Sequence, residues 1–435
     1  MSLTTPDSAP RDYTPQHPIR YLLAALIALG PFTMSLYTPS MPAIALALAT
    51  SDALVQTSIA IFLVAVAAGQ LVYGPLSDRY GRRPILFMGY ALFILASIIC
   101  ALAQTIDQLL MARFLQGLGA SSGAVMSRAI IRDLFEKADI AKMLSFVSMA
   151  LAIAPAIGPL LGGQLQDHFG WQSNFIILAL SGLVLLVVVA ISMPETNRDI
   201  VVPSGDTAVK GPGYFLRAYG SVLSTRQFLG YAAPVAGALA GIFSFHSVGP
   251  FVLIDQLGVA PTAYGWFTLM SVSGYFFGAF ISNRLAGRVP GDRMIVTGLG
   301  IAGLAALGMV ILGWLAMAGT VTLTPLGFMP PMIGWALSAG LIMPNGATGA
   351  LQPFPRIAGT ASALLGSLQI GAGAAMSAVI GLIGGFLPLT FGLVMVGLVL
   401  VSIAVYLWGV VVNPACHNFM RALEPCDDTS VSTIE

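Results

Sequence analysis

The stretch GPLSDRYGRRPILF, Gly74–Phe87, places three arginines in a short turn between two long apolar runs. A charged side chain at the centre of a bilayer costs on the order of 3 kcal/mol or more, so such a cluster belongs at a membrane surface. Arginine and lysine gather on the cytoplasmic side of membrane proteins. The turn is therefore expected at the cytoplasmic surface, between two membrane-spanning helices. Its glycines, Gly74 and Gly81, are expected to let backbones approach closely.

The composition is that of a membrane protein. Of the 435 residues, 57% are hydrophobic and only 9% are charged, whereas soluble domains contain roughly 25% charged residues. The net charge of +1 gives no indication of a nucleic-acid partner. The three cysteines have the spacing neither of a disulfide framework nor of a metal site. We therefore expect no metal and no cofactor.

Twelve stretches are long and apolar enough to span a membrane as helices, which takes about 20 residues. They are continuous rather than alternating, which argues against the strands of a membrane β-barrel. The expected spans are 21–43, 55–76, 84–104, 107–130, 143–165, 173–193, 227–254, 262–282, 294–317, 325–350, 358–383 and 386–411.

The loop charges indicate the orientation of these spans. The chain has 19 lysines and arginines, and all but Arg113 fall in the tails, or in or beside the loops, on one side of this map. By the positive-inside rule that side is the cytoplasm, so both termini are expected there. The opposite loops carry no cation and only four acidic residues: Asp52, Asp107, Asp167 and Asp255.

The spans divide into two halves. We expect a cytoplasmic tail (1–20), a six-helix bundle (21–193), a cytoplasmic central loop (194–226), a second six-helix bundle (227–411) and a C-terminal cytoplasmic tail (412–435). A weak repeat relates the halves, as in transporters built from parallel six-helix repeats with a site between them. Its four pairs, each 205 residues apart, are Gly69 and Gly274, Asp78 and Asn283, Arg79 and Arg284, and Arg83 and Arg288.

Longer motifs carry a family resemblance. The turn at 74–84 resembles the helix 2–3 signature of the major facilitator superfamily, and RFLQGLGASSGAVMSRAIIRD (113–133) resembles its helix 4 signature. APAIGPLLGG (154–163) is similar to the helix 5 signature of proton-coupled antiporters, and 343–369 is similar to the Bcr/CflA-type drug exporters. The resemblance covers about residues 20–410. It implies an all-α membrane protein of that superfamily, with twelve helices in two six-helix bundles.

The resemblance also implies that the helix 2–3 turn latches the two halves in the outward-facing state. This role would fall to Asp78, Arg79, Arg82 and Arg83. Asp78, at the end of helix 2, can accept hydrogen bonds from a helix N-terminus or pair with an arginine. The alternative is that the arginines only fix the topology.

Arg113 is the strongest functional candidate on chemical grounds. A cation inside an apolar helix should face the protein interior and have a partner. Helical spacing makes Gln116 the nearest polar group, and Gly117 leaves room for a neighbour. The resemblance implies a role in proton coupling, and the alternative is a structural arginine.

The helix 5 motif combines prolines, which bend a helix, with glycines, which allow close packing. The resemblance favours a tight, kinked seam suited to antiport. Ordinary packing of small residues is the alternative. The motif residues are Pro155, Gly158, Pro159, Gly162 and Gly163.

Helix 1 departs from the family. Related exporters commonly carry an aspartate two residues before Tyr37, where this chain has Ser35, and no Asp or Glu lies in the middle of any expected span. His246 is the only histidine inside a span, and imidazole titrates near pH 6.5. The group that couples to protons is therefore open between Arg113 with its neighbours, Asp78, Asp133 and His246.

A mostly apolar cavity with a few polar groups suits amphiphilic small molecules. Polar and aromatic residues at cavity-lining positions in this fold are the candidates for it: Ser35, Tyr37, Gln116, Phe243, His246, Tyr275, Asn345 and Gln369.

These observations favour a monomeric multidrug efflux antiporter of a bacterial inner membrane. It would export a small amphiphilic compound by alternating access, with the proton gradient as its energy source. One alternative is a transporter of an endogenous solute such as a purine, an amino acid or a siderophore, drawn to Arg113 if anionic. A membrane-bound enzyme or receptor is disfavoured, because the sequence has no clustered His/Glu metal site, no GxSxG elbow between a strand and a helix, and no loop long enough for a catalytic domain.

Overall fold

The computed structural model describes residues 17–135, 137–197, 212–354, 357–383 and 388–412. Within these ranges the regular elements are all helices. Most of both expected tails, residues 198–211 of the expected central loop, and Arg356 lie outside the described residues.

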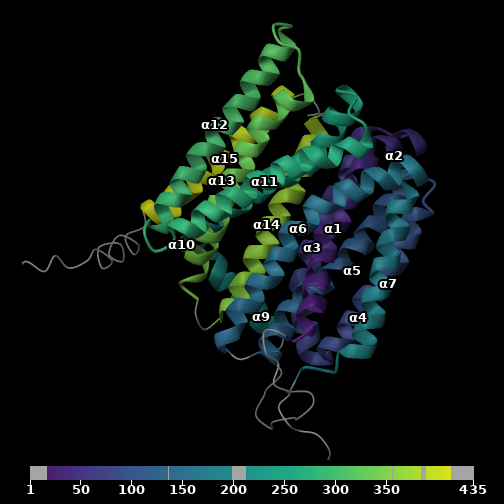
Figure 1. Cartoon of the computed structure of the whole chain (residues 1–435). Coiled ribbons are helices and arrows are strands. Elements are labelled where there is room, and N and C mark those ends of the chain that lie inside the picture. Colours follow the sequence, from purple (N-terminus) through teal and green to yellow (C-terminus); the bar gives the residue numbers. More distant parts are fainter. Residues whose placement is uncertain (1–16, 136, 198–211, 355–356, 384–387, 413–435) are drawn as a thin grey trace, which may run out of the picture. The chain divides into compact units, whose positions relative to one another are not determined.

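The chain divides into two compact units. Unit 1 comprises Met1–Val209 and Ala260–Leu269, and unit 2 comprises Lys210–Val259 and Met270–Glu435. Within unit 1, α1 lies along α6, while α5 packs on both α3 and α4 (Figure 1). Its helices are α1 (Ile19–Tyr37), η1 (Thr38–Ser40), α2 (Met41–Ala47), α3 (Asp52–Tyr80), α4 (Arg82–Ala101), α5 (Ile106–Leu134), α6 (Lys137–Phe169) and α7 (Gln172–Ser192), together with the start of α11 (Pro261–Leu285).

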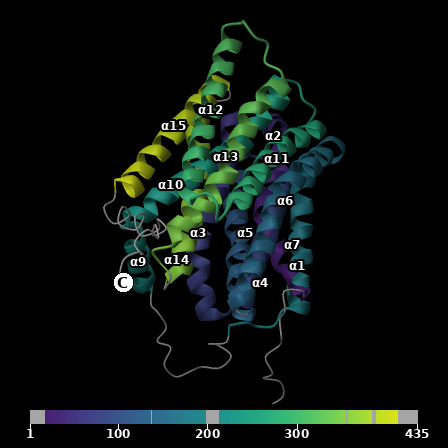
Figure 2. The same cartoon turned by 60° about the vertical axis from the view of Figure 1, so that its left-hand side comes forward.

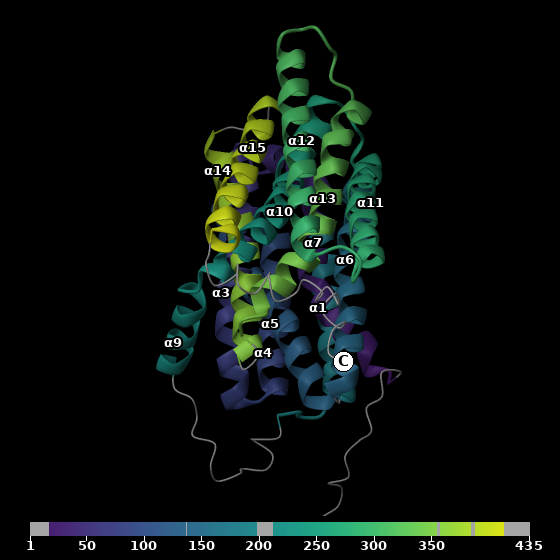
Figure 3. The ribbon, with the colours of Figure 1, turned by 90° about the vertical axis from the view of Figure 1, so that its left-hand side faces the viewer.

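Unit 2 is built in a similar way from paired helices. In it α12 packs along α13 and α15, and α10 packs along α13 and α14 (Figure 2 and Figure 3). Its elements besides the rest of α11 are α9 (Pro212–Leu223), α10 (Arg226–Pro250), η2 (Phe251–Gln256), α12 (Gly291–Met317), α13 (Pro325–Leu351), α14 (Ala358–Ile383), α15 (Pro388–Tyr406) and η4 (Leu407–Val411).

The sequence-based prediction of the fold class is confirmed. Each of the twelve expected spans coincides with one helix or with a run of consecutive helices. Within the described residues, nine of these segments are long and apolar enough to cross a membrane by length and composition alone. The helices α5, α6 and α11 fall outside that group. In α5 the reason is visible in the sequence, because Arg113, Gln116 and three serines interrupt the apolar residues.

Several helices are longer than the hydrocarbon core. The helices α3 and α5 have 29 residues each, which corresponds to about 44 Å at 1.5 Å per residue, against a core of about 30 Å. The two helices are therefore long enough for their last turns to extend beyond the hydrocarbon. Asp78 near the end of α3 and Asp133 near the end of α5 lie in these last turns.

Two local expectations need correction. Gly74 has no atom within 4 Å of the position of an added Cβ, so no close backbone approach requires it. Gly81 does have a structural reason, because its φ of 98° lies in the left-handed region that favours glycine and allows the sharp turn between α3 and α4. The expected central loop also contains a helix, α9, which packs against α14 and α10.

Candidate functional site

The first candidate site is centred on Arg113 of α5, whose side chain is fully buried in unit 1. Its Nη1 donates a hydrogen bond to Oε1 of Gln116 over 2.6 Å, which confirms the partner predicted from helical spacing. The guanidinium lies between two aromatic faces, with Cζ 4.5 Å from the ring centroid of Tyr37 and 4.3 Å from that of Phe62. The site thus draws on α1, α3 and α5.

Close packing brings Phe62 to this position. A Cβ on Gly117 would lie 2.5 Å from the Phe62 carbonyl oxygen, so only glycine allows α3 and α5 to approach this closely. The prediction that Gly117 admits a neighbour is confirmed.

Hydroxyl and amide groups extend the site to α4. Gln116 Nε2 donates to Ser97 Oγ over 2.8 Å, and the Ser97 hydroxyl donates to the Phe93 carbonyl over 2.7 Å. On the other side of the guanidinium, the Tyr37 hydroxyl is hydrogen-bonded to the Ser58 hydroxyl. Polar side chains from four helices therefore surround Arg113, and all those named are neutral.

The charge of Arg113 is incompletely satisfied. Among the described residues, its Nε and Nη2 atoms have no hydrogen-bond partner, and no carboxylate lies within ion-pair distance. Two cation–π contacts contribute about 2 kcal/mol each when desolvated, against a desolvation penalty of several kcal/mol for a buried ion. Since a guanidinium does not give up its proton, Arg113 provides a permanent positive charge to whatever anionic or polar group approaches.

Ser35 lies elsewhere in unit 1, against α6. Its Oγ is 3.3 Å from the carbonyl oxygens of Ala154 and Phe32, and a Cβ on Gly158 would lie 2.1 Å from the same Oγ. The residue in the family's acidic position thus contacts the helix 5 motif directly.

The other helix 5 motif residues also lie at tight contacts or inside the helix. A Cβ on Gly162 would lie 1.8 Å from the Leu36 carbonyl oxygen, and one on Gly163 would lie 2.1 Å from that of Pro261. Pro155 and Pro159 both lie inside α6. The packing at these glycines is therefore tight, which fits both the expected seam and ordinary packing of small residues.

The second candidate site lies at the C-terminal ends of α3 and α5 and at the N-terminus of α4. Arg82 donates from Nη1 to Asp78 over 2.6 Å and from Nε to Asp133 over 2.9 Å, so one guanidinium joins two carboxylates. The Asp78 side chain is 55% exposed, whereas those of Arg82 and Asp133 are 11% and 20% exposed. The network is therefore partly shielded from water. Arg79 is exposed and stacks beside Tyr80.

Glu195 completes this cluster, and the sequence analysis did not identify it. Its carboxylate accepts hydrogen bonds from the backbone N–H groups of Arg82 and Arg83, at 2.9 and 3.0 Å. It also accepts from the backbone N–H groups of Thr196 and Asn197, both at 2.9 Å. A carboxylate here satisfies free N–H groups at the start of α4 and opposes the positive end of the helix dipole.

Further bonds join this cluster to the end of α7 and to the residues after it. Asn197 Nδ2 donates to the Ser77 and Asp78 carbonyls, at 3.3 and 3.1 Å, and Arg83 Nη2 donates to the Ala190 carbonyl over 2.7 Å. The sequence does contain a signal for Glu195. It is an acidic residue just after an apolar span, in the segment PETN, Pro194–Asn197.

The candidates in unit 2 lie on α10, α11, α13 and α14. His246 is buried in α10, and its Nδ1 has no hydrogen-bond partner among the described residues. Phe243 packs on α14, where a Cβ on Gly373 would meet its ring at 2.2 Å. Tyr275 of α11 and Gln369 of α14 are half-buried.

The side-chain amide of Asn345 is hydrogen-bonded within the protein. Its Nδ2 donates to Ser282 Oγ over 2.8 Å and to the Leu341 carbonyl over 2.7 Å. These bonds tie α13 to α11 and occupy the amide hydrogens, so a contact of the amide with a substrate would have to replace one of them.

Comparisons with known proteins agree with this description. Residues 23–378 match the family model described as Major Facilitator Superfamily. A bicyclomycin resistance protein homolog of Haemophilus influenzae is 30% identical over 362 residues, covering 82% of this chain and 87% of the relative. Multidrug resistance protein D of Escherichia coli K12 is 30% identical over 357 residues, covering 81% of this chain and 86% of the relative.

A solved structure shares the fold. The crystal structure of a bacterial homolog of the human lysosomal transporter Spinster superposes with a TM-score of 0.67 at 18% identity, over 93% of this chain and 98% of that one. The family match, the two relatives and the shared fold show that this chain belongs to the major facilitator superfamily and resembles its Bcr/CflA-type drug exporters.

Proposed function

We propose that this transporter exports small amphiphilic compounds, including drugs, from the bacterial cytoplasm in exchange for protons. It would act as a monomer in the inner membrane, with both termini in the cytoplasm and its two six-helix halves alternating in access. The names of the two resistance-related proteins support the substrate class. The segregation of lysine and arginine supports the orientation.

The observation that carries this proposal is the incompletely paired guanidinium of Arg113 inside a spanning helix. A buried charge that costs several kcal/mol and has only neutral partners contributes little to stability. Its retention is best explained by a partner that arrives during the transport cycle. Tyr37 and Gln116, which contact Arg113, are then the first candidates for substrate contact.

The proton requires a different group, because a guanidinium keeps its own proton. Asp78 and Asp133 both pair with Arg82, so protonation of either carboxylate weakens that network and links proton uptake to the proposed latch. His246 is the corresponding candidate in unit 2. Under this proposal the proton and the compound favour different conformations, and the difference in affinity drives the cycle.

The test is transport by purified protein in proteoliposomes with an imposed pH gradient. A panel of lipophilic cations, neutral amphiphiles and bicyclomycin should contain at least one compound whose flux depends on the gradient and stops when it is collapsed. Flux that is unaffected by collapse of the gradient would remove the antiport mechanism. Absence of flux for every compound of the panel would contradict the proposal that the substrates are small amphiphilic compounds.

One observation favours a second candidate function. The expected spans contain no central carboxylate to attract a cationic drug, and Arg113 has N–H groups without a protein partner among the described residues. An anionic metabolite would complement this charge. A counterflow panel of organic anions in the same proteoliposomes separates the two candidates, because an anion transporter exchanges labelled anions and ignores lipophilic cations.

A further inference from the structure

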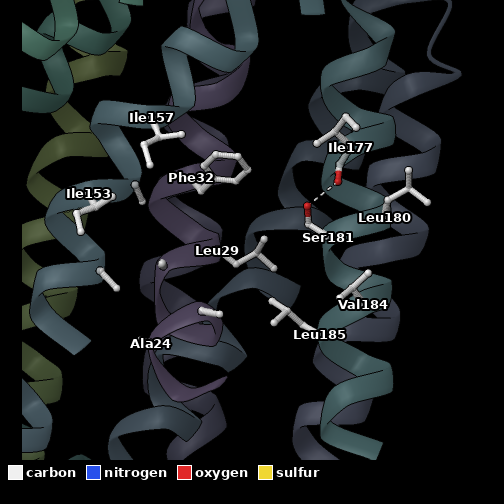
Figure 4. Close-up of a pocket in the computed structure, with 14 residues that line it drawn as sticks. Ala24, Leu29, Phe32, Ile153, Ile157, Ile177, Leu180, Ser181, Val184 and Leu185 are labelled. Carbon is white, nitrogen blue, oxygen red and sulfur yellow. Dashed lines mark hydrogen bonds between the residues drawn. The ribbon is translucent and has the colours of Figure 1, made fainter. Parts of the chain in front are cut away.

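An apolar groove on unit 1 lies outside both candidate sites. It runs between α1, α6 and α7 (Figure 4). Its volume is about 590 Å³. Alanines form much of the α1 wall, α6 contributes both alanines and isoleucines, and α7 contributes mostly larger apolar side chains. Ser181 is the only lining residue with a side-chain hydroxyl, and this hydroxyl donates to the Ile177 carbonyl over 2.8 Å. The groove therefore offers an apolar surface and no open polar group.

The groove faces outward from unit 1. Four of its lining residues are strongly exposed: Ile153 at 51%, Ile157 at 44%, Leu180 at 51% and Val184 at 61%. Apolar side chains exposed to this extent along membrane-spanning helices are normally covered by lipid chains.

One end of the groove carries an aromatic pair and a cation. Tyr21 lies one helical turn before Ala24 on α1, and Phe146 lies one turn before Ala150 on α6. Their rings meet edge to face, with centroids 5.7 Å apart. The Arg20 guanidinium lies over both rings, 4.7 Å from the Tyr21 centroid and 5.3 Å from that of Phe146.

The depth of the groove matches one leaflet of a bilayer. From Ala24 to Phe32, both lining residues, α1 rises about 12 Å, while one leaflet of a 30 Å hydrocarbon core measures about 15 Å. Arg20 and Tyr21 stand at the start of the first span, where interfacial aromatic and basic residues are usual. In the proposed orientation this end lies at the cytoplasmic surface.

We propose that the groove binds one anionic phospholipid of the cytoplasmic leaflet. One acyl chain lies along α1, α6 and α7, and the phosphate lies beside the guanidinium of Arg20, which also donates from Nη2 to the Tyr21 hydroxyl over 2.6 Å and attracts an anionic headgroup by its charge. The apolar walls, the leaflet-deep extent and the cation at the surface end together require an amphiphile with a long apolar chain and an anionic head. The inference depends on the proposed orientation but not on the identity of the transported compound.

Photolabelling tests the position of the lipid without any substitution. The wild-type protein is reconstituted in phosphatidylethanolamine vesicles containing a small fraction of phosphatidylglycerol with a diazirine in one acyl chain. The label is expected in peptides of α1, α6 and α7 that line the groove. Label spread evenly over all outward-facing helices would overturn the proposal, because it would show ordinary boundary lipid.

Variants test the two ends of the lipid separately, by native mass spectrometry of protein extracted from mixed lipid. Ala25→Phe fills the groove and is expected to abolish retention of the lipid. Ala91→Phe, at an exposed position of α4, is the matched control and should retain it. Arg20→Gln is expected to weaken binding of phosphatidylglycerol about fivefold, as for loss of one cation near an anionic lipid surface.

Arg284→Gln is the control for Arg20→Gln, because Arg284 also stacks on an aromatic ring, that of Phe280. Retention that is equal in Arg20→Gln and wild type would overturn the headgroup assignment. Retention that is equal in Ala25→Phe and Ala91→Phe would overturn the groove as the site. Binding of phosphatidylethanolamine as tight as that of phosphatidylglycerol would overturn the anionic class.

Discussion

Two arginines of unit 1, Arg82 and Arg113, are held in opposite ways. Arg82 bonds to two carboxylates, at 2.6 and 2.9 Å, beyond the expected apolar spans. Arg113 is fully buried inside an expected span and has one hydrogen bond to a neutral amide and two aromatic faces. The charge of Arg82 is thus balanced within the protein, and that of Arg113 is not.

This difference separates a charge that stabilises the structure from a charge that is available for function. Removing a charge from a balanced network leaves its partners unsatisfied, which destabilises the protein. Removing an unbalanced buried charge also removes its desolvation penalty, so the free energy of unfolding should change little. Substitution of Arg113 should therefore lower transport activity most, and substitution of Arg82 should lower the free energy of unfolding most.

The largest expected effect is on transport by Arg113→Ala. We expect gradient-driven flux to fall about 100-fold, which corresponds to losing one or two hydrogen bonds to a charged group at about 1.5–3 kcal/mol each. Initial rates in proteoliposomes measure it. Arg113→Lys keeps the charge but loses the planar fork, so an intermediate rate is expected. A rate and pH profile equal to wild type in Arg113→Ala would remove this residue from the mechanism.

Stability provides the second test of the comparison. Arg82→Met leaves Asp133 partly buried without its partner, and the free energy of unfolding should fall by about 1–3 kcal/mol. Arg113→Met removes a charge without stranding a carboxylate, so the unfolding temperature should stay the same or rise. Thermal unfolding in detergent measures both. Equal losses in the two variants would contradict the assignment of roles.

The comparison also shows what the sequence could predict. The spans follow from apolar runs about 20 residues long, and the contact of Arg113 with Gln116 follows from helical spacing, because both depend on neighbours in sequence. Tyr37 and Phe62 are 76 and 51 positions away from Arg113. Their place over its guanidinium depends on the packing of α1 and α3 on α5, which no local pattern encodes.

The misses have a similar origin. Glu195 caps a helix that begins 113 residues earlier, so the helix it caps cannot be inferred from its own surroundings. The helix α9 has 12 residues, fewer than the roughly 20 of a membrane span, so a search for spans leaves it inside the expected loop. Gly74 was expected at a close contact because of the motif around it, but the neighbouring helices leave it open.

Glu195 tests whether the Arg82 cluster depends on the start of α4. Glu195→Ala leaves the first N–H groups of that helix without their acceptor, and loss of a cap costs about 0.5–2 kcal/mol. We expect a lower unfolding temperature and slower turnover with little change in apparent affinity. Glu195→Gln keeps an oxygen acceptor and should lose less. Asp167→Asn, at an exposed carboxylate, is the control, and a loss of stability as large in Asp167→Asn as in Glu195→Ala would contradict this role.

The smallest expected effect is on the pH profile of His246→Gln, which extends the comparison to unit 2. Arg113 carries a fixed charge, whereas an imidazole can gain and lose a proton near neutral pH. The Nδ1 of His246 has no hydrogen-bond partner among the described residues, so one ring nitrogen can take up a proton without breaking a bond within them. If His246 carries the transported proton, flux should vary less with pH in His246→Gln than in wild type.

The control for this profile is His168→Gln, because His168 is exposed at the end of α6. A pH curve for His246→Gln identical to that of wild type would leave Asp78 and Asp133 as the proton-carrying candidates. The fixed charge of Arg113 and the exchangeable proton would then both belong to unit 1. The proton would be taken up within the network that Arg82 balances, so the arginine that stabilises the structure would also take part in coupling.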